Sequence, residues 1–111
     1  MSRTEKHIEA GIVRDLRALG CAVTKTSQHG KPLGMTEGLP DLYASHPRWQ
    51  IRLWIEVKTA RGRLRPAQAD WHARERAAGG TVIVARSTAD VIGAFRALGA
   101  PIGPVSARQR G

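Results

Sequence analysis

The segment from residue 38 to residue 58 constrains the fold most, because it predicts a β-hairpin. Residues 50–58 (QIRLWIEVK) alternate apolar and polar side chains, as a half-buried strand does. Residues 41–45 predict a shorter strand introduced by Pro40, which is tolerated at the start of a strand. Residues 46–49 (HPRW) predict the turn between the two strands.

The register of this hairpin follows from the positions of its charged residues. Paired residues of an antiparallel hairpin have position numbers with a constant sum. Positions 41 and 56 add to 97, which centres the hairpin between Arg48 and Trp49, where the turn is predicted. We therefore expect Asp41 to lie opposite or diagonal to Glu56, with Cα atoms roughly 5 Å apart.

Side chains alternate across a strand, so Glu56 shares one face with Trp54 and Lys58. The apolar side chains of the opposite face point to the core: Leu53, Ile55 and Val57. A buried carboxylate beside an ammonium group is costly without compensation, and two adjacent carboxylates repel unless a cation lies between them. Oxygen ligands alone favour Mg²⁺ or Mn²⁺ over zinc, so the hairpin predicts such a metal site.

The remaining segments predict three helices and two further strands. An amphipathic helix over 4–19, with Thr4 as its N-cap, precedes a strand over 21–26 and a long polar loop over 27–38. A helix from Pro66 to about Ala78 and a buried strand over 81–85 follow the hairpin. In the last helix, Ser87 and Asp90 resemble a capping box, and four apolar residues share one face: Val91, Ile92, Phe95 and Leu98. The order αβββαβα predicts an α/β fold with a mixed sheet flanked by helices.

Composition favours a polyanionic partner. Eighteen Lys and Arg against nine Asp and Glu give a net charge of +9 and a pI near 11.3. The chain has no amphipathic basic helix and no apolar run near the roughly 20 residues of a membrane span, so we expect DNA rather than a membrane. Cys21 is the only cysteine, which excludes an intrachain disulfide and a thiolate zinc cluster. We expect a cytoplasmic protein.

A divalent metal at Asp41 and Glu56 would suit phosphodiester hydrolysis, since it polarises a phosphoryl oxygen and lowers the pKa of water. Lys58 can stabilise the developing charge or orient the attacking water. Arg61, Arg63 and Arg65 follow the hairpin closely and are predicted to contact DNA phosphates. A weaker hypothesis gives the same role to Lys31 and His29 in the long loop.

Three motifs, GLPDL, WIEVK and GRLRPAQ, resemble the VRR-NUC branch of the PD-(D/E)XK nuclease superfamily over about residues 5–98. The resemblance implies a restriction-endonuclease-like αβββαβ core, with a nuclease domain over 1–100 and a basic Pro/Gly-rich tail over 101–111. It implies metal ligation by Asp41, Glu56 and the carbonyl of Val57, and catalytic roles for Lys58 and Gln68. It also implies an acidic or amide ligand from the first helix, for which Glu9 is our choice and Glu5 a competitor.

The resemblance implies a metal-dependent DNA endonuclease encoded by a bacterium or a phage and associated with the nucleoid. Some relatives cut four-way (Holliday) junctions, a task that a homodimer would suit because two symmetric cuts need two sites. Alternatives are a nicking, flap or restriction-type nuclease, or a non-catalytic nucleic-acid-binding module. Charge alone would also fit a ribosomal or RNA-binding protein. The four histidines are predicted to lie on the surface or beside the site, and Trp71 to anchor its helix to the sheet: His7, His29, His46 and His72.

Overall fold

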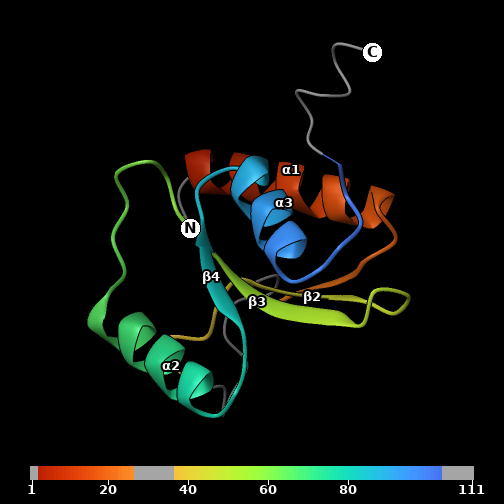
Figure 1. Ribbon diagram of the computed structural model, residues 1–111. Helices are drawn as coiled ribbons and strands as arrows, with labels where there is room; N and C mark the ends of the chain where they lie inside the picture. The colour runs from red at the N-terminus through yellow and green to blue at the C-terminus, as the bar shows by residue number, and fades with distance from the viewer. Residues whose placement is uncertain (1–2, 27–36, 104–111) are drawn as a thin grey trace.

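The computed structural model describes residues 3–26 and 37–103 and shows a four-stranded mixed sheet between two helical layers (Figure 1). Figure 1 shows α1 and α3 together over one face of the sheet and α2 on the other. The elements follow the predicted order: α1 (Arg3–Ala18), β1 (Ala22–Lys25), β2 (Leu42–His46), β3 (Ile51–Val57), α2 (Pro66–Ala77), β4 (Val82–Ala85) and α3 (Thr88–Ala97). The predicted α/β class is confirmed.

The strands lie in the order β1-β2-β3-β4, antiparallel except for the parallel pair of β3 with β4. In the β2–β3 hairpin Leu42 pairs with Ile55 and His46 with Ile51, so each pair of position numbers adds to 97. The predicted register is therefore confirmed. The turn itself covers residues 47–50, one position later than predicted, because His46 still belongs to β2.

The core lies between the sheet and the α1/α3 layer. Leu53, Ile55 and Val57 of β3 are almost fully buried there, which confirms the predicted core face of this strand. Helix α1 contributes Ile12 and Leu16 at helical spacing. The core is completed by Leu42 and Ala44 of β2 and by Val91 and Phe95 of α3. The opposite face of β3, which carries Glu56, is left for α2.

Several helix boundaries differ from those predicted. Thr4 lies inside α1, which already begins at Arg3, so it is not the N-cap. Ser87 does cap α3, accepting a hydrogen bond from the Asp90 N–H at 3.3 Å, but the Asp90 carboxylate bonds the N–H of Arg86 instead of closing the box on Ser87. Leu98 is the C-cap of α3 and is 43% exposed rather than part of its buried face, because the helix ends at Ala97.

His46 is buried rather than a surface residue. Its Nε2 lies 2.8 Å from the carbonyl oxygen of Leu19, and its ring stacks on Trp49 with centroids 3.7 Å apart. This histidine therefore joins the hairpin turn to the end of α1. Among the described residues, no helix combines the length and the apolar character needed to cross a membrane. His29 and Lys31 lie outside the described residues.

Candidate active site

Asp41 stands immediately before β2 and is held by its neighbours in the sheet. Its Oδ2 accepts a hydrogen bond from the backbone N–H of Val57 at 2.8 Å. Its backbone carbonyl accepts one from the N–H of Thr26 at 2.9 Å, at the end of β1. These two bonds fix Asp41 between β1 and β3, at the end of the hairpin where the register places Glu56.

Glu56 is 2% exposed, and its two carboxylate oxygens have different surroundings. Oε2 accepts a hydrogen bond from Gln68 Nε2 at 3.0 Å and lies 3.9 Å from Lys58 Nζ. Oε1 has no hydrogen-bond partner among the described residues, and His72 Nε2 lies 3.7 Å from it. The side chain is therefore held on one side, and one of its oxygens remains free to accept a further ligand.

Gln68 links this carboxylate to the start of α2. Its Oε1 accepts a hydrogen bond from the backbone N–H of Arg65 at 2.9 Å, so the same side chain caps the helix and holds Glu56. Gly38 packs against this first turn with a φ of 89°, and a Cβ at that position would lie 2.2 Å from the carbonyl oxygen of Ala67. Only glycine fits such a close approach, which explains the glycine of the GLPDL motif.

Burial disfavours the charged form of each carboxyl group of the site. Burial, reinforced by the negative charge of Asp41, raises the pKa of Glu56 to about 8, although the charges of Lys58 and Arg65 oppose the shift. Burial also raises the pKa of Asp41, against the hydrogen bond from Val57. The pKa of Glu9, which is 6% exposed, is raised by burial and then by the charge of Asp41. The site therefore favours protons or a cation over free carboxylates.

The candidate site supplies some, but not all, of the oxygen ligands that a hard divalent cation needs. Asp41 and Glu56 supply carboxylate oxygens, and the unpartnered Oε1 of Glu56 is a buried polar atom that needs a ligand. In the described part of the chain, no three His, Cys, Asp or Glu side chains gather closely enough to form a metal-binding group. Glu9 is thus near enough to Asp41 for their charges to interact without completing a set of three with Glu56.

Lys58 follows the end of β3 and is 9% exposed. Its backbone N–H donates to the carbonyl of Ala85 at 3.0 Å, which continues the β3–β4 pairing by one residue. Its ammonium group therefore stands beside Glu56 on the α2 face of the sheet. This is the face that strand alternation predicts for both residues.

The connector from β3 to α2 presents three arginines to solvent. Arg61, Arg63 and Arg65 are exposed, whereas the residues between them are half-buried. Arg86 fixes the connector, since its Nη1 donates to the carbonyl oxygens of Thr59 at 2.5 Å and Gly62 at 2.7 Å. The role of Arg86 carries no signal in the sequence, because it depends on a contact between segments more than 20 residues apart.

Aromatic side chains anchor α2 next to the site. Trp71 packs edge-on against Trp54, with ring centroids 5.1 Å apart, as predicted for a residue that anchors its helix to the sheet. Trp54 in turn contacts Tyr43 of β2, with centroids 4.6 Å apart. His72, predicted to lie on the surface or beside the site, is buried directly against Glu56.

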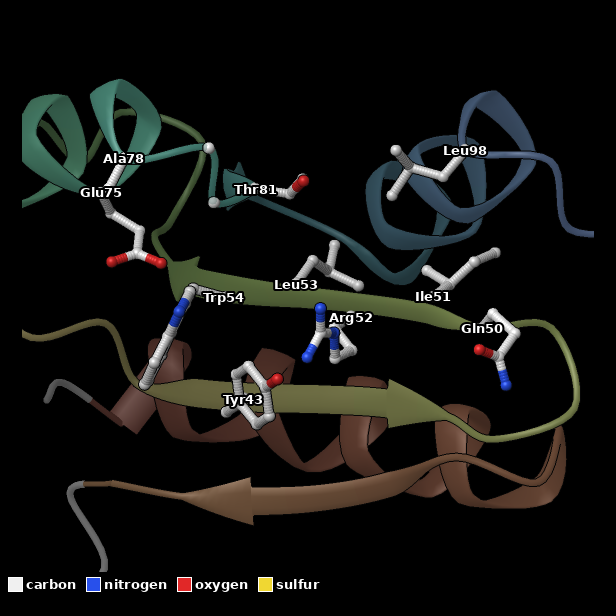
Figure 2. A pocket seen from close by; sticks show the side chains of 12 residues that line it. Tyr43, Gln50, Ile51, Arg52, Leu53, Trp54, Glu75, Ala78, Thr81 and Leu98 are labelled. Atoms are coloured by element: carbon white, nitrogen blue, oxygen red, sulfur yellow. The ribbon is translucent and has the colours of Figure 1, made fainter.

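A groove of about 440 Å³ runs along the first half of β3, before the residues of β3 that pair with β4. Figure 2 shows Tyr43, Arg52 and Trp54 on one side of β3 and Leu53 with Leu98 on the other. Neither carboxylate of the hairpin lines this groove. The candidate site is separate from it, at the opposite end of β3.

Comparison with known proteins agrees with this architecture. No protein-family model and no curated protein matches the sequence. A solved structure described as a VRR_NUC domain matches with a TM-score of 0.68 and 28% identity, over 86% of this chain and 97% of that one. The chain therefore has the fold of a VRR-NUC domain, and the resemblance indicated by its motifs is confirmed.

Proposed function

From this VRR-NUC architecture and the carboxylate pair of the hairpin, we propose that the protein is a metal-dependent endonuclease that hydrolyses phosphodiester bonds of DNA. The observation that carries the proposal is the buried Glu56 beside Asp41, with an unpartnered oxygen and a pKa raised to about 8. Carboxyl groups so arranged lower their free energy by binding a divalent cation. Such a cation can activate a phosphodiester for hydrolysis.

The proposed cation is Mg²⁺ or Mn²⁺, held by Asp41, Glu56 and the carbonyl of Val57, with Glu9 as a further ligand. When bound, it supplies Lewis-acid polarisation of a phosphoryl oxygen and a lower pKa for water. Lys58, next to Glu56, stabilises the negative charge that develops on the phosphate. Gln68 acts by keeping the Glu56 carboxylate in place.

The DNA backbone is proposed to follow the connector that leaves the site. Arg61, Arg63 and Arg65 are exposed there, and the positive charge of Arg65 opposes the rise in the pKa of Glu56. These arginines would neutralise the phosphates on either side of the cut. We also propose a DNA contact for Lys31, which lies outside the described residues.

Branched DNA, in particular the four-way junction, is the proposed substrate, cut by a homodimer with two symmetric sites. The chain contains no separate base-reading motif, which supports recognition of shape over sequence. We assign this activity to a domain over 1–100, followed by a basic tail over 101–111. The proposed setting is the nucleoid in the cytoplasm of a bacterium or of a phage-infected cell.

The test compares four-way, flap, nicked, linear duplex and single-stranded DNA, end-labelled, with Mg²⁺ or Mn²⁺ and with a chelator. The wild-type protein should cut the four-way junction fastest, and the Asp41→Ala and Glu56→Ala variants should cut none. Faster cleavage of flap or nicked DNA than of the junction would indicate a flap or nicking endonuclease instead of a junction resolvase. Binding of DNA without cleavage of any substrate would leave a non-catalytic binding module and refute the nuclease proposal.

A further inference from the structure

His72 is a buried histidine whose ring nitrogens have no hydrogen-bond partners among the described residues. Its side chain is 1% exposed, and neither Nδ1 nor Nε2 is bonded. Nε2 faces Glu56 Oε1, the other unpartnered buried atom of the site, at 3.7 Å. Buried polar atoms in folded proteins are nearly always hydrogen-bonded. Two neighbouring atoms that both lack a partner, and lie slightly beyond bonding distance, favour a bond between them, and the second lone pair of Oε1 stays available to a cation.

We propose that His72 is a positioning residue of the metal site, whose Nε2–H donates a hydrogen bond to Glu56 Oε1 and orients the carboxylate toward the cation. The inference rests on the proposed function, since it assigns His72 a task at the metal site of that function. It adds a residue that neither the motifs nor the superfamily signature contains.

The geometry of α2 supports this role. Gln68 and His72 are four residues apart on one helix, so their side chains lie one above the other on the same face. Gln68 already bonds Oε2, and His72 faces Oε1. One helix face thus holds both oxygens of the carboxylate, and the contact of Trp71 with Trp54 fixes that face against the sheet.

His72 can act only through Glu56, because a side chain that is 1% exposed does not touch a substrate. A neutral imidazole has one N–H to donate, and the Nε2–H tautomer places it toward the carboxylate. Donors behind a ligand hold it in the ionised, correctly rotated form that binds metal.

The test measures Mn²⁺ affinity directly, by titration of the full-length protein followed by calorimetry and by the EPR signal of free Mn²⁺. His72→Leu, which keeps the volume but removes the donor, should weaken binding about 10- to 100-fold. His72→Gln, whose amide N–H can replace Nε2–H, should recover most of the affinity that His72→Leu loses. The matched control is His46→Leu, a second buried histidine far from the site. It should lower thermal stability without changing Mn²⁺ affinity.

Equal affinity in the wild type and His72→Leu would overturn the inference alone and leave the proposed function intact. Absence of Mn²⁺ binding in the wild type, with no difference from Glu56→Gln, would instead remove the metal-dependent function and the inference with it. Should His72→Leu fail to fold, ¹⁵N NMR of the wild-type histidines decides the question. The inference requires the Nε2–H tautomer of His72, and the Nδ1–H tautomer would contradict it.

Discussion

The side chain of Asp41 accepts a hydrogen bond from the backbone N–H of Val57 at 2.8 Å, so one carboxylate of the site is bonded to the residue next to the other. The contribution of this bond to stability can be measured separately from the contribution of the Asp41 charge. Asp41→Asn removes the charge and keeps an acceptor, whereas Asp41→Ala removes both. In metal-free protein we expect Asp41→Ala to be less stable than Asp41→Asn by about 1–3 kcal/mol, the cost of leaving a part-buried N–H unbonded. Chemical denaturation measures this difference, and equal stability of the two variants would show that the bond contributes nothing.

The buried Glu56 should make metal-free protein less stable as the pH rises. Its pKa is raised from 4.5 to about 8, so the folded state favours the protonated form. The associated stability is full below pH 4.5 and is lost as the pH rises toward about 8. The pKa of His72 is lowered, so this residue makes the protein less stable as the pH falls, and its effect is confined to pH values below its ordinary pKa of 6.5. The window between pH 6.5 and 8 therefore excludes His72, and it ends at the raised pKa of Glu56, whose titration is linked to that of Asp41.

We expect the melting temperature of the wild-type protein in chelator to fall across this window and that of Glu56→Gln to stay nearly constant. Mn²⁺ should remove the decline in the wild type, because the bound cation replaces the proton. The exposed Glu37 supplies a control, since Glu37→Gln should keep the wild-type slope. An unchanged slope in Glu56→Gln would assign the pH dependence to another group.

Gly38 and Gly79 form a matched pair for testing the contact between the GLPDL motif and α2. Both have positive φ angles, 89° and 95°. A Cβ at Gly38 would lie 2.2 Å from the Ala67 carbonyl oxygen, whereas nothing lies within 4 Å of one at Gly79. Gly79→Ala should cost about 1–2 kcal/mol of stability for its backbone conformation alone. Gly38→Ala should cost more and should also reduce Mn²⁺ affinity, because it displaces the helix turn that carries Gln68. Equal effects of the two substitutions on stability and affinity would contradict this contact.

The hairpin and the residues around its two carboxylates could be predicted from the sequence, because strand alternation and turn position are local signals. A register of two strands then brings Asp41 beside Glu56 without any knowledge of the tertiary structure. Lys58 and Trp71 follow from the same local periodicities.

The roles of His46, His72 and Arg86 could not be predicted in this way. A histidine is compatible with the surface or the interior, and only the packing of α2 and α1 against the sheet decides which applies. Arg86 acts on carbonyl groups distant in the sequence. Helix ends were also predicted imprecisely, as with Thr4, because a capping residue one position inside the true start satisfies the same pattern.

The connector arginines should determine how strongly DNA binding depends on salt. The double variant Arg61→Ala/Arg63→Ala should bind all DNA shapes more weakly. It should also lower the slope of log K against log salt concentration by about 0.9 for each phosphate that the protein no longer neutralises. A double variant of exposed α1 residues, Arg14→Ala/Arg17→Ala, makes the same change in net charge. Fluorescence anisotropy between low and physiological salt measures both slopes. A smaller effect of the connector variant than of the α1 variant would place the DNA elsewhere.

The central claim is that the carboxylate pair of the hairpin performs metal-dependent DNA cleavage. The most direct measurement is single-turnover cleavage of a labelled four-way junction by the wild type, Asp41→Asn and Glu56→Gln, in Mn²⁺ and in chelator. Both substitutions nearly preserve shape, so DNA binding should remain. We expect cleavage by the wild type only with metal, and a loss of at least about 100-fold in rate for each variant. Wild-type cleavage in chelator, or variants as active as the wild type, would contradict the account.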